Sequence, residues 1–156
     1  MIYVTNAIPV NAEGEPELTR SDVWSGLVMK ADNALPFVPA MTLCEVLERR
    51  GEHEFDRDIE FRGQRFTERI TLEPQQRVTF TRIAGEVLGT IANEIEESAG
   101  GELSLRFSFA LVLKGVVPGS DEEAAYAEGM KGDYLKAVEA TLAAIRKVAK
   151  GETVGV

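Results

Sequence analysis

The chain has 156 residues, of which 44% are hydrophobic and 28% are charged, a balance typical of a globular domain rather than a disordered segment. Acidic residues outnumber basic ones 26 to 17, and the resulting net charge of −9 disfavours nucleic acid and anionic membrane surfaces as partners. A single cysteine, Cys44, and a single histidine, His53, exclude an internal disulfide and a histidine-rich metal site. The length favours one domain over residues 1–156.

The sequence also lacks the usual signals for export, membrane insertion and cofactor binding. Its first residues carry neither a basic segment nor a long apolar one, and no apolar run reaches the roughly 20 residues that a membrane helix needs. No glycine pattern is typical of phosphate binding, and no serine or cysteine lies in a nucleophile-elbow motif. We therefore expect a cytoplasmic protein without cofactor or metal, in which Cys44 is a small buried hydrophobe and His53 is exposed beside a turn.

In chain order, apolar alternation predicts a strand over residues 2–10, followed by a turn and a helix. Thr19 is the predicted N-cap of that helix, with Asp22 at its third position, and Asn33 lies at its end. Residues 34–39 are too rich in proline to extend the helix, so one or two short helices are expected before the second strand. The apolar face of this helix is predicted at positions 23, 24, 27, 28 and 31.

From residue 42 the hydrophobic period changes to two, and short separators between the segments require antiparallel neighbours. Ser120 then starts a long helix over about residues 121–149, which Gly151 ends. The order predicts an α+β fold with its helices on one side of the sheet. The six further strands are predicted at residues 42–49, 54–62, 65–73, 77–83, 86–97 and 102–113.

The dimensions of these elements predict a cavity. Seven strands spaced by about 4.8 Å make a sheet roughly 34 Å wide, whereas a helix is only about 10–12 Å across. The sheet must therefore curl around the C-terminal helix to cover its apolar face. A curled sheet that grips one helix tends to leave space at one end, so the geometry favours an internal ligand cavity.

The hairpin over residues 54–73 presents two different faces. Its outer face sets acidic residues of one strand against arginines of the next, and such exposed pairs contribute about 0–1 kcal/mol each, without implying a function. On its inner face, Arg57 and Glu68 share the phase of large apolar residues and are predicted to meet. They form either a structural ion pair or a charged anchor for a ligand. Asn93 either faces inward as well or lies beyond the core.

The C-terminal helix repeats Tyr126, Met130 and Tyr134 at four-residue spacing, which is most often core packing. Gly129 and Gly132 flank Met130 and weaken the helix where the mouth of a cavity would need mobility. The residues predicted to bind the ligand are Trp24, Phe37, Phe55, Arg57, Ile59, Phe61, Glu68, Ile70, Phe80, Ile91, Asn93, Phe107, Phe109, Met130 and Tyr134.

Four segments carry a family resemblance: residues 18–27 (LTRSDVWSGL) continuing to PFVP at 36–39, FDRDIEF at 55–61, FTERI at 66–70 and IANEIE at 91–96. Together they resemble the AtaL-like family of the START/birch-pollen-allergen superfamily (SRPBCC). The resemblance implies a helix-grip fold, in which a seven-stranded antiparallel sheet wraps around a C-terminal helix with a hydrophobic cavity between them. Members of the wider superfamily bind lipids, sterols, flavonoids, hormones or polyketides, and some branches are cyclases or aromatases.

Three functional hypotheses follow. The preferred one is binding or carriage of a hydrophobic small molecule, such as a lipid, a steroid or a polyketide-like compound, without chemistry. The alternative is an enzyme similar to polyketide cyclases or dehydratases, with Arg57 as polarising group and Glu68 as acid or base. A neighbouring arginine favours an ionised carboxylate, which suits an orienting pair better than a general acid. The third hypothesis is a domain that forms a homodimer and whose cavity is incidental.

Overall fold

The computed structural model describes residues 1–151, and it confirms the predicted α+β order with strand bounds that differ from the expected ones by at most one residue. One helix, not two, lies between the first and second strands, because the segment after Asn33 forms only turns. The elements are β1 (Ile2–Pro9), α1 (Arg20–Asp32), β2 (Met41–Arg49), β3 (Glu54–Phe61), β4 (Gln64–Glu73), β5 (Arg77–Ala84), β6 (Val87–Glu97), β7 (Leu103–Leu113) and α2 (Asp121–Ala149).

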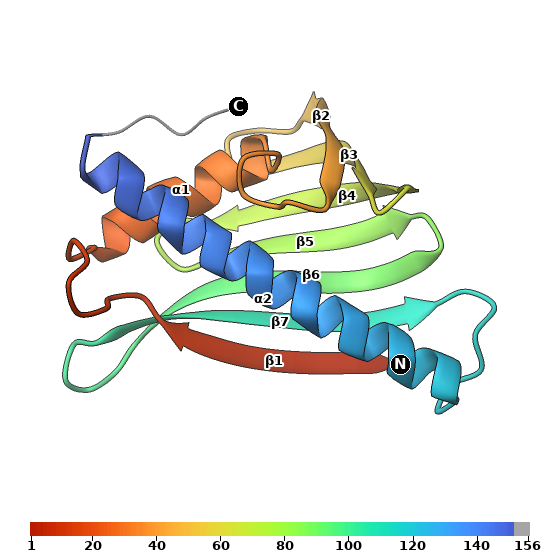
Figure 1. The fold of residues 1–156 in the computed structure, drawn as a ribbon. Coiled ribbons are helices and arrows are strands. Elements are labelled where there is room, and N and C mark those ends of the chain that lie inside the picture. The colour runs from red at the N-terminus through yellow and green to blue at the C-terminus, as the bar shows by residue number, and fades with distance from the viewer. Residues whose placement is uncertain (152–156) are drawn as a thin grey trace.

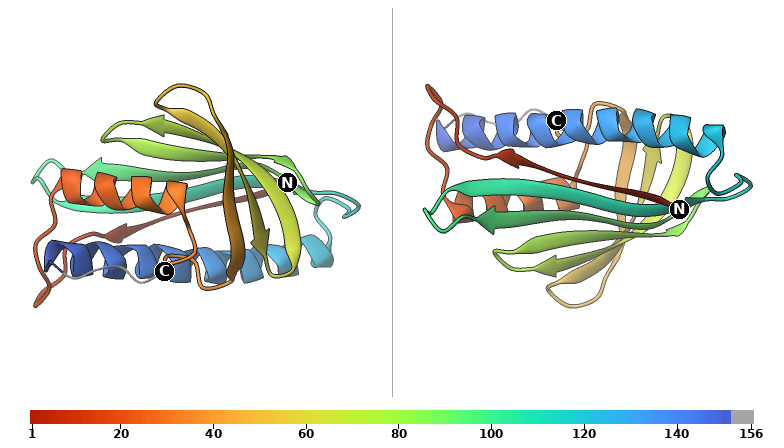
Figure 2. Two further views of the ribbon diagram at one scale, coloured as in Figure 1. Left: turned by 90° about the horizontal axis from the view of Figure 1, so that it is seen from above. Right: turned by 90° about the horizontal axis from the view of Figure 1, so that it is seen from below.

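The seven strands form one antiparallel sheet in the order β1-β7-β6-β5-β4-β3-β2. Helix α2 crosses one face of the sheet diagonally, and α1 lies on the same side (Figure 1). Viewed from above, the sheet bends strongly, so that β2 rises out of the plane of the other strands and approaches α2 (Figure 2). This arrangement confirms the helix-grip fold.

Local irregularities in the strands accompany the curvature. The pairing of β4 with β5 shifts register between Thr67 and Glu68, and the pairing of β2 with β3 shifts twice. Such bulges bend a strand and increase its twist. In β6, Gly89 has a φ of +134°, and a Cβ there would lie 2.1 Å from the carbonyl oxygen of Ala110 in β7. Only glycine permits this close approach of two strand backbones.

Helix α1 begins as predicted, and its predicted face is buried at positions 23, 27 and 31. The Thr19 side chain accepts from the backbone of Asp22, whose carboxylate accepts from the Thr19 amide, which completes a capping box. The buried residues include Gly26 and Lys30, whereas Trp24 is only half-buried. Trp24 nevertheless packs against the core and Val28 is half-buried, so Gly26 and Lys30 widen the predicted face. Gly26 packs so closely on Ile145 of α2 that a Cβ would lie 2.2 Å from that side chain.

The core fills the concave side of the sheet beneath the two helices. The inward residues of the central strands are buried, and on α2 the buried apolar side chains recur from Met130 to Ile145. Cys44 is half-buried rather than buried, because β2 is an edge strand. The buried aromatic and aliphatic side chains of the inner sheet face include Phe55, Ile59, Ile70, Phe80, Ile91, Phe107 and Phe109.

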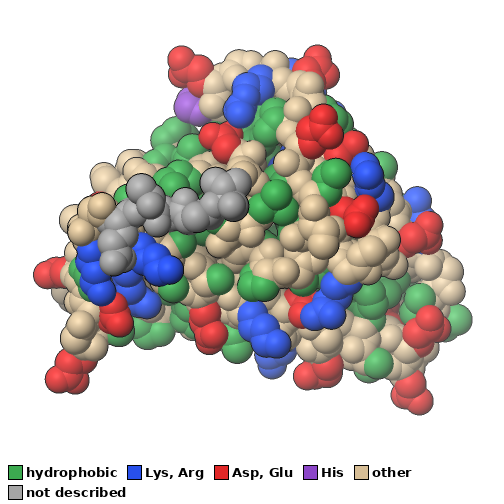
Figure 3. Space-filling model, turned by 45° about the horizontal axis from the view of Figure 1, so that its top comes forward, with side chains coloured by type: hydrophobic (Ala, Val, Ile, Leu, Met, Phe, Trp, Pro, Cys, Tyr) green, Lys and Arg blue, Asp and Glu red, His purple; other side chains and the backbone are tan. Residues whose placement is uncertain are grey.

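The outer surface carries the predicted charge pairs. Arg69 donates to Asp56 across the β3–β4 hairpin, and Arg65 pairs with Glu60 further along. His53 is exposed, as expected. Acidic and basic side chains are interspersed over the face shown in Figure 3. Neither α1 nor α2 combines the length and the hydropathy that a membrane-crossing helix requires.

Candidate functional site

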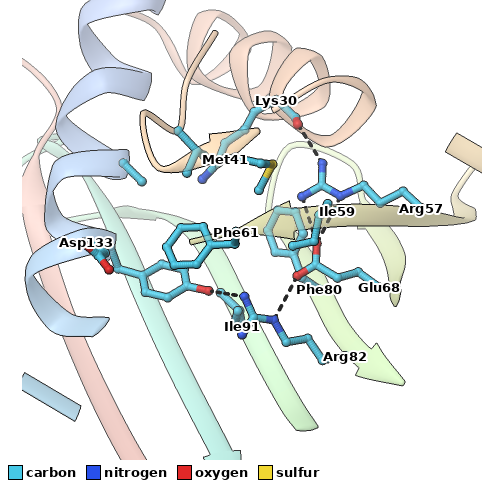
Figure 4. Close-up of a pocket in the computed structure, with 13 residues that line it drawn as sticks. Lys30, Met41, Arg57, Ile59, Phe61, Glu68, Phe80, Arg82, Ile91 and Asp133 are labelled. Atoms are coloured by element: carbon cyan, nitrogen blue, oxygen red, sulfur yellow. Dashed lines mark hydrogen bonds and ion pairs between the residues drawn. The ribbon is translucent and has the colours of Figure 1, made fainter. Parts of the chain in front are cut away.

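A small pocket lies between the concave sheet face, the C-terminal end of α1 and the middle of α2 (Figure 4). Its volume is about 30 Å³, which admits about one water molecule. Its walls are mostly apolar, but five charged side chains share the lining with them. The lining residues are Lys30, Val38, Met41, Arg57, Ile59, Phe61, Glu68, Phe80, Arg82, Ile91, Asp133, Tyr134 and Ala137.

Arg57 and Glu68 form the predicted inward pair. A two-residue turn at Arg62 and Gly63 places them directly opposite each other on β3 and β4. Arg57 Nε and Nη2 donate to Glu68 Oε1 at 3.1 and 3.0 Å, and both side chains are 3% exposed. The prediction that the two residues meet inside the fold is confirmed.

Arg57 also joins the sheet to the end of α1. Its Nη1 donates to the carbonyl oxygens of Lys30 and Ala31 at 3.0 and 2.8 Å. Carbonyls in the last turn of a helix lack partners within the helix and carry its partial negative charge, so a buried cation is stabilised there. The guanidinium therefore bridges a carboxylate on β4 and the C-terminal end of α1.

Arg82 is the first site residue that the sequence analysis missed. Its Nε donates to Glu68 Oε2 at 3.4 Å, and its Nη2 donates to the Tyr134 hydroxyl at 3.3 Å. Its Nη1 is buried and has no hydrogen-bond partner in the described part of the chain. The alternation of buried and exposed residues in β5 could have revealed Arg82, because it shares the inward phase of Val78 and Phe80.

Lys30 is the second site residue that the sequence analysis missed. Its Nζ donates to Asn93 Oδ1 at 2.9 Å, so Asn93 faces inward, one of the two positions considered from the sequence. Burial and the nearby Arg57 guanidinium lower the pKa of Lys30 to about 8. Helical spacing from Val23 and Leu27 places Lys30 on the buried face of α1, and this spacing was the signal that could have revealed it.

The α2 side of the pocket contributes a phenol and a carboxylate. Burial raises the pKa of Tyr134 to about 12, so its hydroxyl is protonated at neutral pH, and its ring packs on Phe109 at a centroid distance of 5.1 Å. The neighbouring Asp133 accepts from Arg62 of the β3–β4 turn. This ion pair joins the hairpin to α2 at the rim of the pocket.

The predicted binding residues divide between the pocket and its surroundings. Trp24 lies half-buried on α1, while Phe37 and Met130 line two other depressions near α2. The predicted residues that line the pocket are Arg57, Ile59, Phe61, Glu68, Phe80, Ile91 and Tyr134. Those buried in the core outside its lining are Phe55, Ile70, Asn93, Phe107 and Phe109.

The fold is the helix-grip fold of the START and aromatase/cyclase structures that the chain resembles. The chain belongs to the AtaL family, described as "Acetylaranotin biosynthesis cluster protein L", whose model matches residues 4–152. No curated protein sequence matches it.

Three solved structures illustrate the likeness in fold. The Zhui aromatase/cyclase from a Streptomyces species has a TM-score of 0.70 and 18% identity, covering 97% of this chain and 98% of the other. A START superfamily protein from Mycobacterium smegmatis has a TM-score of 0.66 and 14% identity, covering 91% of this chain and 97% of the other. The di-domain ARO/CYC StfQ of the steffimycin biosynthetic pathway has a TM-score of 0.66 and 13% identity, covering 96% of this chain and 52% of the other.

Proposed function

We propose that this protein binds a small organic molecule with an apolar body in the pocket between the sheet and α2. The observation that carries the proposal is the composition of the lining, in which apolar walls surround a few fixed polar groups, the arrangement typical of small-molecule sites. Two proteins of similar fold are named as aromatase/cyclases, which favours a polyketide-like ring system over a lipid or a steroid.

Binding requires the pocket to widen, because about 30 Å³ is far below the roughly 300–1,000 Å³ of drug-sized sites. The Arg62–Asp133 ion pair is the candidate gate, since two depressions of about 300 Å³ each flank it. Gly129 and Gly132 lie on the same stretch of α2 and lower its helical stability. Separation of the β3–β4 turn from α2 would join these depressions to the pocket.

The contacts of Arg57 and Glu68 favour binding over catalysis by this pair. Both oxygens of Glu68 accept from arginines, and Arg57 is held by Glu68 and by the end of α1. A carboxylate fixed in this way orients other groups more readily than it transfers a proton. A cyclase-like reaction therefore remains the second candidate, supported by the aromatase/cyclase neighbours rather than by these two residues.

The test is titration with Nile red, an uncharged apolar dye, on wild type and two variants of α2. Ala137→Leu fills the pocket, whereas Ala143→Leu adds the same atoms at an exposed position of the same helix. We expect saturable binding to wild type and Ala143→Leu, and at least about tenfold weaker binding to Ala137→Leu, since each 1.4 kcal/mol is a factor of ten. Equal affinities for the two variants would place the dye outside the pocket and contradict the proposal.

A further inference from the structure

We propose that the pocket recognises an anionic oxygen group on its ligand, with Arg82 as the principal contact, so that the protein selects organic acids over neutral molecules of the same shape. This inference rests on the proposed function and specifies the chemical class of its ligand.

The buried charges of the pocket do not balance. In residues 1–151 the fully buried charged side chains are three cations, Lys30, Arg57 and Arg82, and one anion, Glu68. Asp133 also lines the pocket, but its carboxylate is bound by Arg62 at the rim. Buried charges in proteins are ordinarily paired, because removal from water is costly for each of them. The pocket therefore concentrates excess positive charge inside a chain whose net charge is −9.

Arg82 carries part of this excess charge and has one hydrogen-bond donor without a partner in the described residues. Its side chain is 2% exposed, and its Nε and Nη2 donate to Glu68 and Tyr134. Arg82 lines the pocket, and its remaining nitrogen, Nη1, is buried and donates to no described residue. Almost all buried donors in proteins have a partner, so one without a partner in the protein points to an acceptor supplied from outside.

The neighbouring groups indicate an anion rather than a neutral acceptor. A carbonyl or a water would occupy Nη1 but would leave the charge excess unchanged. A guanidinium matches the planar geometry of a carboxylate, and hydrogen bonds between charged partners are the stronger class. The Tyr134 hydroxyl, which accepts from Arg82, keeps its own proton at neutral pH and can donate it to the same anion. Phe61 and Ile91 line the same pocket as Arg82 and would contact the apolar body of the ligand.

The experiment compares 2-naphthoate with 2-naphthamide, two molecules of nearly equal shape of which only the first is charged. We expect naphthoate to bind wild type at least about tenfold more tightly than naphthamide does. Arg82→Met should weaken naphthoate binding about 10- to 100-fold and change naphthamide binding less than about threefold, as loss of a charged hydrogen bond requires. Arg106→Met, which removes the same charge from the outer sheet surface, should leave both affinities unchanged.

The outcomes separate this inference from the proposed function. Equal affinity of wild type for the two compounds, or an unchanged preference in Arg82→Met, overturns the anion site while binding itself stands. Failure of wild type to bind naphthoate, naphthamide and Nile red overturns both. If Arg82→Met does not fold, Arg82→Lys keeps the charge but removes the Nη1 donor, and its naphthoate affinity must fall at least about threefold.

Discussion

Glu68 is the only buried carboxylate of the pocket in the described residues, which makes its charge more important for stability than that of Arg57. Glu68→Gln keeps the shape of the side chain but removes the negative charge from contact with two arginines. Arg57→Met removes one cation and leaves Glu68 paired with Arg82. We therefore expect Glu68→Gln to destabilise the fold more than Arg57→Met does.

The magnitudes follow from the contacts. Removal of one partner from a buried ion pair typically costs about 3–5 kcal/mol, and Glu68→Gln should lie in the upper part of this range because three cations then remain without a counter-charge. Arg57→Met leaves the carbonyls of Lys30 and Ala31 without their donor, at about 1–3 kcal/mol each, but relieves repulsion from Lys30 and Arg82. This relief offsets part of the cost of the two lost hydrogen bonds, so Arg57→Met should be the milder change.

Urea denaturation of wild type, Glu68→Gln, Arg57→Met and the double variant Arg57→Met with Glu68→Leu measures these free energies. Removal of both members of an isolated buried pair is often close to neutral. Here the double variant should remain destabilised, because Arg82 loses its carboxylate as well. A double variant as stable as wild type, or Arg57→Met less stable than Glu68→Gln, would refute the view that Glu68 serves both arginines.

Three further predictions concern Lys30, the helix contact and the rim. Between its lowered pKa of about 8 and the usual 10.5, Lys30 binds more protons in the unfolded chain than in the folded protein. The free energy of unfolding, measured by urea denaturation, should therefore rise by about 2 kcal/mol from pH 7.5 to 10. Lys30→Met should lack this rise. Gly26→Ala should destabilise the fold by about 1–3 kcal/mol through overpacking. Gly129→Ala, at a position where a Cβ meets nothing, should stabilise it by about 0.5–1 kcal/mol. Equal effects of the two changes in thermal melts would contradict the tight contact between α1 and α2. Asp133→Asn should increase the rate of Nile red entry in stopped flow, while an unchanged rate would show that the Arg62 ion pair is not the gate.

The sequence predicted the strands and much of the inner face, because alternation with period two leaves little freedom once one face is apolar. Arg57, Glu68 and Asn93 were found in this way. Arg82 and Lys30 were missed because a long basic side chain is usually exposed, although both share the period of buried neighbours. Their inward orientation depends on partners from other elements, namely Tyr134 on α2 and Asn93 on β6.

The size of the pocket was beyond prediction for a related reason. Whether a curled sheet leaves a cavity depends on the side chains that converge from three directions. Val38 approaches from the segment after α1, Met41 from the start of β2 and Ala137 from α2, to meet Phe61 and Phe80. Packing at the density of protein interiors removes all but about 30 Å³ of the expected space.

The hydrogen bonds from Arg57 to the last carbonyls of α1 have a consequence for local unfolding. They attach a short helix to a hairpin that is distant in sequence, so α1 cannot detach without leaving a guanidinium buried beside fewer acceptors. The last turn of α1 and strand β3 should therefore open as one cooperative unit, and their amide hydrogens should exchange with similar free energies. In Arg57→Met the two segments should separate, with the amides of the helix exchanging well before those of the strand.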